Sequence, residues 1–323
     1  MRSSIRGFGM TETRTTGTQL LLGQPVVATG DADALDRIAD LSPAKRTLHR
    51  FLSHRLAVFG AFVIAVLAIC GVLAPIVAPH DPNRIDLLQI ARSPSPAHLL
   101  GTDAVGRDAL SRIIYGARIS LSVGVGAVGI YIAIGFVLGA LAGYAGGWVD
   151  NLLMRFTDIM MCFPTFVLIL ILVGILGPSI WNVIFAIGLF GWPGIARLVR
   201  GQVLQLRELD YVIAARILGA GATDVMFRHI LPNVIGPLTV AATLGIAGAI
   251  LTEAGLSFLG LGVVQPTPSW GSMLNDARSP ATLADKPWLW IAPGVSISLA
   301  VLAINFIGDG LRDAFDVRSR AVG

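Results

Sequence analysis

The sequence predicts an all-α polytopic membrane protein with six transmembrane helices. Of its 323 residues, 54% are hydrophobic and only 14% are charged, and the mean hydropathy is +0.74. A soluble domain carries about 25% charged residues, so much of this protein's surface must face lipid. Glycine is abundant at 37 residues, as expected where transmembrane helices pack closely.

Six apolar segments are long enough to cross the hydrocarbon core, which takes about 20 helical residues. They cover residues 56–77, 119–143, 159–177, 180–199, 234–258 and 288–307. Pro75 and Pro79 end the first segment. Pro164, Pro193 and Pro293 fall inside other apolar runs, and each predicts an interruption of its helix.

The basic residues between the spans predict that both termini lie in the cytoplasm. They cluster before the first span, between the second and third, between the fourth and fifth, and after the last. With six spans these positions share one side. The outer loop 80–118 opposes this assignment with its arginines, but Asp81, Asp86, Asp103 and Asp108 offset most of that charge. The formal charge of +4 therefore reflects topology, and we expect no nucleic-acid partner.

The remaining segments are assigned as termini and loops. We expect residues 1–42 to be a disordered cytoplasmic tail, since they are rich in Thr, Asp and Gly and lack a signal-peptide pattern. Residues 43–55 lead into the first span, 56–317 form the membrane domain, and 318–323 form a cytoplasmic C-terminus. The outer loop 80–118 contains proline and tight glycine turns, and the second outer segment, 260–287, is expected to fold over the mouth of the bundle.

The polar segment 208–232, between the fourth and fifth spans, predicts a docking surface for a soluble partner. One short helix is expected over 208–218 and a second from Thr223, as N-cap, to Leu231, with Pro232 ending it. Glycines between them permit a sharp turn. The alternative is an amphipathic helix lying on lipid headgroups, but small residues and paired glycines make a poor lipid anchor. The expected contact residues are Glu208, Asp210, Tyr211, Ala214, Ala215, Arg216, Gly219, Gly221, Arg228, His229 and Pro232.

Several segments, in order, resemble permeases of the dipeptide/oligopeptide ABC importer family, specifically the second, C-type permease of the pair. The similarity extends from about Pro43 to Arg318. The coupling segment has the spacing Ala-Ala-x3-Gly-x12-Pro, starting at Ala214. The other matching segments are HLLGTDAVGRD at 98–108, YGARISL at 115–121, GYAGGW at 143–148, FRHILPN at 227–233, LSFLGLG at 256–262, PTPSWG at 266–271 and GDGLRD at 308–313.

This resemblance implies the type I ABC importer permease fold, with 208–232 as its cytoplasmic coupling loop. It further implies a bacterial inner-membrane location, a homologous second permease, two ABC ATPase subunits and an extracytoplasmic peptide-binding protein. Short di- or oligopeptides are the expected substrates, with nickel, glutathione or another small solute as the alternative within the same family.

Two features of this chain qualify the implied coupling. The family usually has Glu immediately before the Ala-Ala pair, whereas Ile213 stands there, so an acidic contact to the ATPase is missing. The chain also lacks a Gly-x4-Gly-Lys-Ser/Thr run. ATP and magnesium are therefore expected on the partner ATPase subunits, with no cofactor bound by this chain.

Polar groups at membrane depth are the candidates for a translocation path or an outer gate. Glu253 lies toward the outer end of the fifth span, where we favour a structural hydrogen bond that holds the second outer segment. Trp270 and Asn305 are further candidates, and for Asn305 we favour an interhelical hydrogen bond. Asp158 is expected to pair with Arg155 at i, i+3.

Three other functional classes remain as competitors. A stand-alone carrier driven by protons or sodium ions needs charged residues at the membrane midplane and two repeated halves. Glu253 is the single candidate charge, and the sequence shows no internal repeat. A membrane-embedded enzyme needs converging catalytic groups. The histidines are scattered and both cysteines lie in apolar runs, so we expect no catalytic or metal site. An exporter is the third, and the long outer loops favour import because they offer a platform for a receptor.

Overall fold

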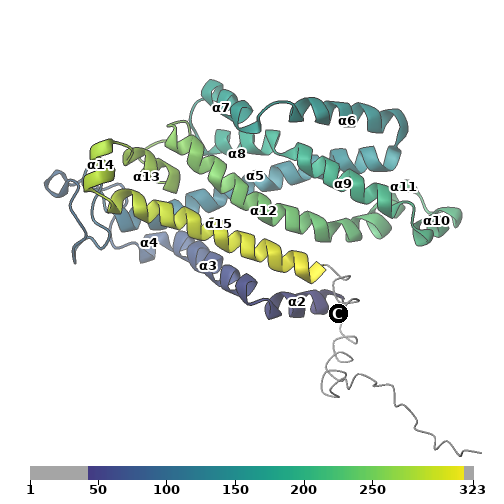
Figure 1. Cartoon of the computed structure of the whole chain (residues 1–323), viewed down its shortest axis with the longest axis horizontal. Helices are drawn as coiled ribbons and strands as arrows, with labels where there is room; N and C mark the ends of the chain where they lie inside the picture. The colour runs from purple at the N-terminus through teal and green to yellow at the C-terminus, as the bar shows by residue number, and fades with distance from the viewer. Residues whose placement is uncertain (1–42, 316–323) are drawn as a thin grey trace, which may run out of the picture. The chain divides into compact units, whose positions relative to one another are not determined.

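The computed structural model describes residues 43–315 as helices joined by loops, with no strand among the described residues. Figure 1 shows the helices, which in chain order are α2 (Pro43–Ser53), α3 (Arg55–Val72), α4 (Ala74–Val77), η1 (Leu87–Gln89), α5 (Ala109–Ala145), α6 (Gly147–Met161), α7 (Thr165–Leu176), α8 (Ile180–Phe190), α9 (Trp192–Leu206), α10 (Asp210–Ile217), α11 (Ala222–Asp224), η2 (Val225–Ile230), α12 (Leu231–Phe258), α13 (Trp270–Asp276), α14 (Pro280–Asp285) and α15 (Trp288–Phe315). The expected all-α class is confirmed. The predicted tail 1–42 and C-terminus 318–323 lie outside the described residues.

Five described helical segments are long and apolar enough to cross a membrane. They are Arg55–Val72, Ala109–Ala145, Ile180–Leu206, Ala222–Phe258 and Trp288–Phe315. Each contains most of one predicted span. The predicted interruption at Pro193 is present, because α8 ends at Phe190 and α9 begins at Trp192, beside the proline. The predicted interruption at Pro293 is wrong, because α15 continues through this proline in its second turn.

The predicted third span, 159–177, is broken at Pro164, as the proline predicted, and it is not a single helix. Its residues are shared between α6 and α7, which pass the length and hydropathy criteria only together and are bent by 80° at the break. The break falls at Pro164, which heads α7 with extended ψ. A proline has no amide hydrogen and restricts the residue before it, so α6 cannot continue through this position. The pair is either a broken span or a re-entrant loop.

The predicted outer loop 80–118 is too long by ten residues, because α5 already begins at Ala109. Asp108 caps this helix: its Oδ2 accepts hydrogen bonds from the backbone amide of Ser111 at 2.8 Å and from the Ser111 hydroxyl at 2.7 Å. Such a cap satisfies amides that the first helical turn leaves free. The basic residues Arg112 and Arg118, which suggested a loop, lie within the first three turns of α5.

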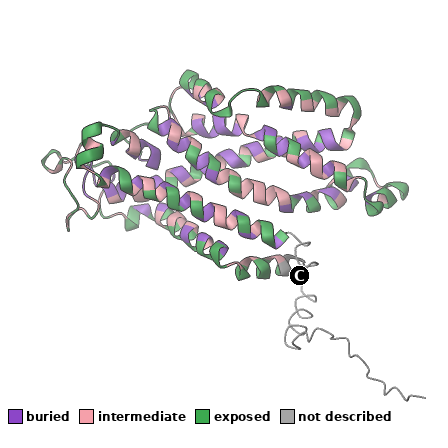
Figure 2. Cartoon of the chain, viewed as in Figure 1, coloured by how far each residue is buried: buried purple, intermediate pink, exposed green. Residues whose placement is uncertain are grey.

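Close backbone packing joins α5 to α9. Three glycines at i, i+4 spacing, Gly135, Gly139 and Gly143, face α9, and a methyl group added at Gly139 would lie 2.4 Å from the carbonyl oxygen of Ala196. Small residues at this spacing let transmembrane helices approach closely. The largest buried cluster surrounds this contact and includes side chains of α5, α7, α8, α9 and α12. Figure 2 shows buried residues along the facing sides of these helices.

The two polar regions of the bundle lie at opposite ends of its helices. Figure 1 shows α13 and α14 at the left end and α10 and α11 at the right. Within the segment 260–287, α13 packs against α12, α15 and α5. The fold therefore separates a loop-rich end, formed by residues 80–108 and 260–287, from the end that carries the predicted coupling segment.

Candidate functional site

The predicted coupling segment folds as a short helix, a glycine turn and a second helix. The first helix, α10, matches the expected range within two residues. Gly219 follows it with φ +90°, a conformation that side-chain-bearing residues rarely adopt, and open space surrounds it. Gly221 has φ −67° and stands at the N-cap of α11, where Thr223 was expected. Of the two glycines, only Gly219 is required by the backbone.

The second coupling helix does not end at Pro232, as the sequence predicted. Instead α11, η2 and α12 continue into one another from Ala222 to Phe258. Pro232 is the second residue of α12, and the preceding turn is a wider π-helix in which the amide of Leu231 donates to the carbonyl of Met226. The coupling segment is therefore directly continuous with a membrane-spanning helix.

Three buried valine and isoleucine side chains attach the coupling segment to the bundle. Val212 on α10 and Val225 and Ile230 on η2 are fully buried and belong to the largest apolar cluster. Contacts with α5 add to this attachment: the guanidinium of Arg207, directly before the segment, donates to the carbonyl of Gly143 at 2.9 Å, and Arg216 within the segment lies over the Tyr144 ring. The segment is thus tied to both α5 and α12.

The opposite face of the coupling segment exposes large apolar side chains. Leu218 is 88% exposed, Ile217 80% and Phe227 59%. Figure 2 shows α10 as almost entirely exposed. Large apolar side chains that remain uncovered are typical of surfaces that contact another protein or a membrane. Ile213, at the position where the family usually has Glu, is also exposed and adds to this apolar face.

The other predicted contact residues frame this face. Glu208, Asp210, Tyr211, Ala214, Arg216, Gly219, Gly221, Arg228 and Pro232 are exposed, and Ala215 and His229 are half-buried. Several are held in place by neighbours: the Arg216 guanidinium lies 5.2 Å from the centre of the Tyr144 ring, Arg228 pairs with Asp224 at 3.1 Å, and Glu208 pairs with Arg207 at 3.1 Å. The ring centroids of Tyr211 and His229 are 6.2 Å apart.

Ion pairs that the sequence reading missed join α6 to α9. Arg200 donates two hydrogen bonds to Asp150, at 2.5 and 2.6 Å, and Arg197 pairs with Asp158. The expected pair between Arg155 and Asp158 is confirmed at 3.7 Å. Bidentate arginine–carboxylate contacts are strong and directional. They hold α6 against the helix that leads into the coupling segment.

At the outer end, Glu253 lies fully buried among hydroxyl groups. Its carboxylate accepts hydrogen bonds from Ser257 at 2.7 Å and from Ser120, on α5, at 3.0 Å. The Ser257 hydroxyl in turn accepts from the amide of Val263 at 3.2 Å, in the second outer segment. Glu253 therefore connects α12, α5 and the outer segment, the arrangement expected for a structural hydrogen bond.

The other two candidates for a path or gate differ from each other. Trp270 is fully buried, and its indole donates to the carbonyl of Ile113 at 3.1 Å, which fastens α13 to α5. Asn305 is half-buried in α15 and forms no side-chain hydrogen bond with any described residue. The interhelical bond favoured for Asn305 is therefore not seen in the described part of the chain.

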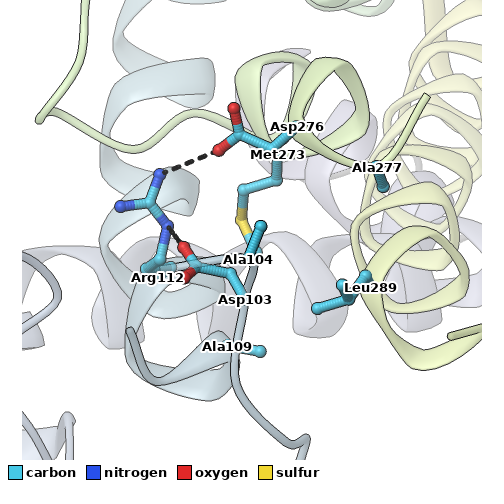
Figure 3. A pocket seen from close by; sticks show the side chains of 8 residues that line it. All are labelled: Asp103, Ala104, Ala109, Arg112, Met273, Asp276, Ala277 and Leu289. Carbon is cyan, nitrogen blue, oxygen red and sulfur yellow. Dashed lines mark ion pairs between the residues drawn. The ribbon is translucent and has the colours of Figure 1, made fainter. Parts of the chain in front are cut away.

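A buried ionic cluster, which the sequence did not predict, joins the two outer segments. Arg107 donates to Asp103 at 2.6 Å, to Gln265 at 2.5 Å and to Asp276 at 3.2 Å. Figure 3 shows Arg112 between the carboxylates of Asp103 and Asp276, with nitrogen–oxygen distances of 3.7 and 3.8 Å. The Arg112 side chain is almost fully buried and also donates to the carbonyl of Pro82 at 3.3 Å. Asp103 and Arg107 are close in the sequence but lie in a turn before α5, so no helical spacing predicted their pairing.

Comparison with known proteins agrees with this architecture. Residues 135–321, more than half of the chain, match the family described as binding-protein-dependent transport system inner membrane component. Residues 42–95 match the N-terminal transmembrane domain of oligopeptide transport permease C. A putative peptide permease of Brucella suis is 48% identical, over 87% of this chain and 93% of its own length.

Other relatives carry different substrate names. A dipeptide transport system permease of Alkalihalophilus pseudofirmus is 41% identical, over 88% of this chain and 93% of its own. A glutathione transport system permease of Pectobacterium atrosepticum is 43% identical, over 87% and 93%. With two family matches and near-complete coverage, this multi-pass inner-membrane chain belongs to the dipeptide/oligopeptide family of ABC importer permeases, as a non-catalytic subunit of the C type.

Proposed function

We propose that this chain forms one half of the translocation pore of a short-peptide importer and couples it to a pair of ATPase subunits through residues 208–232. The family works with ATPase subunits, a substrate-binding protein and a second permease. The observation that carries the coupling role is the exposed apolar face around Ile217, Leu218 and Phe227, which is anchored from behind by buried side chains. A surface of this kind fits a groove on a soluble partner.

The geometry supplies a route from this surface to the outer end. Movement of a docked ATPase displaces α10, which is tied to η2 through the buried Val212 and Val225. Because η2 continues into α12, the displacement passes along one helix to Glu253 and its bond with Ser120. ATP binding and release would thereby favour one of two conformations, which is how coupling to a distant gate operates.

The partner arrangement follows from this assignment. Two ATPase subunits hold ATP and magnesium, the second permease completes the pore, and a peptide-binding protein docks on the outer segments. Both termini lie in the cytoplasm, together with 208–232, and residues 43–55 lead into a membrane domain that extends to about residue 317. The arginines around α9 and the coupling segment support this orientation.

The outer candidates receive different roles. We assign Glu253 and Trp270 to an outer gate, because both are buried and both bond the second outer segment or α13 to α5. Asn305, half-buried without a partner in the described chain, is assigned to the pathway or to the contact with the second permease. These roles require that the gate residues separate when the pore opens outward.

Short peptides are the proposed substrates because two of the relatives are named for peptides or dipeptides. The relative named for glutathione carries what is itself a tripeptide. A discriminating assay is uptake of a labelled dipeptide by cells that express the complete transporter, with unlabelled dipeptide, tripeptide, glutathione and Ni²⁺ as competitors. Competition by peptides alone supports the proposal, whereas competition by glutathione or Ni²⁺ alone would redirect it.

The docking surface is tested by purifying the tagged chain from membranes in mild detergent and identifying the proteins that accompany it. The wild-type chain is expected to retain a similar permease and ATPases that contain a P-loop. Leu218→Glu should lose the ATPases and keep the permease. Leu88→Glu is the matched control, since Leu88 is 84% exposed but lies in the outer loop. Equal ATPase recovery from both variants would remove the docking assignment.

A further inference from the structure

The outer loop brings together two histidines and an aspartate that lie far apart in the sequence. His80 follows α4, His98 lies in the middle of the loop, and Asp108 is the N-cap of α5. One ligand atom from each of the three lies within 4.8 Å of the others. The two imidazole rings are 4.8 Å apart between centroids. The expectation that the histidines are scattered is therefore wrong for this pair.

The individual distances suit a shared ion. The Asp108 Oδ1 atom lies 2.9 Å from His98 Nδ1 and 3.7 Å from His80 Nδ1. Ligands at about 2.0–2.2 Å around a tetrahedral zinc ion are separated by about 3.4 Å. The two printed distances, 2.9 and 3.7 Å, lie on either side of this separation.

One atom of the cluster has no partner in the described chain. His80 Nδ1 is buried and forms no hydrogen bond there. A buried imidazole nitrogen without a partner costs free energy, and a metal ion between the three side chains would satisfy it. The Asp108 carboxylate is already oriented for this role, since its Oδ2 atom is held by Ser111 while Oδ1 faces the histidines. Such outer hydrogen bonds position a metal-binding carboxylate.

The surroundings favour a cation despite the nearby helix N-terminus. The three side chains line an open hollow of about 170 Å³ that also includes Asp81, Asp86 and Arg84. Three carboxylates against one guanidinium leave a net negative charge, which offsets the positive end of the α5 dipole. Two imidazoles with one carboxylate are typical of zinc-type ions, whereas calcium and magnesium require more oxygen ligands.

We propose that His80, His98 and Asp108 bind a divalent transition-metal ion of the zinc type at the extracytoplasmic surface, with a fourth position open to water or to an outside ligand. The ion would connect the end of α4, the middle of the outer loop and the start of α5. The site shares no side chain with the ionic cluster around Arg112, and it requires no assumption about the transported substrate.

The test uses the full-length chain, purified in detergent without a histidine tag and stripped with a chelator. Zn²⁺ is titrated against a chromophoric competitor, and Co²⁺ is added separately because tetrahedral Co²⁺ absorbs visible light. We expect one Zn²⁺ per chain, and at least a tenfold loss of affinity in His80→Asn and in His98→Asn. His49→Asn, an exposed histidine on α2, is the matched control and should bind like the wild type.

His80→Asn is the decisive variant, because it leaves the bond between His98 and Asp108 in place, and the backbone amide of residue 80 can still donate to Ser111. A correctly folded His80→Asn chain that binds Zn²⁺ as tightly as the wild type would overturn the proposal. So would a wild-type chain that binds no Zn²⁺, because His98 and Asp108 would then form only an ordinary structural hydrogen bond.

Discussion

The two ends of this protein satisfy their polar and apolar groups in opposite ways. At the outer end, Arg107 and Arg112 are buried and paired with carboxylates from both outer segments, and Trp270 and Glu253 are fully covered. At the coupling end, Leu218 and its apolar neighbours remain exposed. The buried charges of the outer end are paired with carboxylates of this chain, whereas the exposed apolar side chains of the coupling segment are covered by no described part of this chain.

This contrast indicates where each end derives its stability. Buried ion pairs are costly to break singly, because the remaining charge is left without a partner. The outer segments should therefore depend on their own residues. Exposure of the apolar side chains of the coupling segment to water is unfavourable in free energy, and burial of these side chains against a bound ATPase would remove that penalty. Variants at the outer end should affect folding, and variants at the coupling end should affect transport.

The largest expected effect is on activity at the coupling end. Gly219→Leu forces a side chain into φ +90° and disrupts the turn, so substrate-dependent ATP hydrolysis by the assembled transporter should be abolished while membrane insertion persists. Gly177→Leu is the matched control, because Gly177 has φ +86° and is likewise surrounded by open space. An equal loss of ATP hydrolysis in both variants would show that backbone strain alone causes the effect, without a specific role for the coupling turn.

A large effect on stability is expected at the outer end. Arg112→Ala removes a buried guanidinium between two carboxylates, which should cost about 3–5 kcal/mol in the free energy of unfolding. Denaturant unfolding of the purified chain in detergent measures this loss. Arg92→Ala, an exposed arginine in the same loop, should change the transition little. If the Arg112 variant unfolds like the wild type, the ionic cluster does not hold the outer end.

An intermediate effect is expected at Glu253. Glu253→Leu leaves the hydroxyls of Ser120 and Ser257 without their acceptor, at about 1–3 kcal/mol for each group left buried and unpaired. Glu253→Gln keeps one acceptor and should retain near wild-type stability and apparent affinity for peptide. A large loss of peptide affinity in the Gln variant would show that the carboxylate contacts the substrate.

The smallest effect is expected at Arg155. The Arg155 side chain is 81% exposed, and its guanidinium lies 3.7 Å from Asp158, a long distance for an ion pair. Asp158 also pairs, more closely, with Arg197. Exposed ion pairs contribute little, so Arg155→Ala should leave unfolding and transport unchanged. Arg197→Ala, which removes the closer partner of the same carboxylate, provides the comparison. A stronger effect of Arg155 than of Arg197 would contradict the geometry.

Local patterns predicted the features that depend on neighbouring residues. Long apolar runs predicted the membrane spans, Pro164 predicted the break between α6 and α7, and Gly219 predicted the turn in the coupling segment. The start of α5 was missed because Arg112 and Arg118 are polar, and polarity alone resembles a loop. In the fold, Arg112 pairs with Asp103 from the preceding loop and with Asp276 from the second outer segment, and the second partner could not be predicted from the residues around Arg112.

The same limit explains the missed outer contacts. The pairing of Arg107 with Asp276 joins residues from two separate loops, and His80 meets His98 only after the outer loop has folded back. Neither pair has a fixed spacing along the chain that distinguishes it from chance. The predicted helix end at Pro232 is wrong for a different reason: proline was treated as a terminator, whereas the helix continues through it directly after the π-helical turn η2.

The uninterrupted helix α5 also places a constraint on insertions and deletions. It is 37 residues long, which corresponds to about 55 Å at 1.5 Å per residue. Its first turn carries Arg112 and its last turns carry Gly143, next to the coupling segment. Removing one residue from the middle would rotate one end against the other by about 100°. The rotation of one end of α5 about the helix axis is therefore fixed relative to the other end. Because α5 contains no loop, an insertion or deletion within it changes this relative rotation.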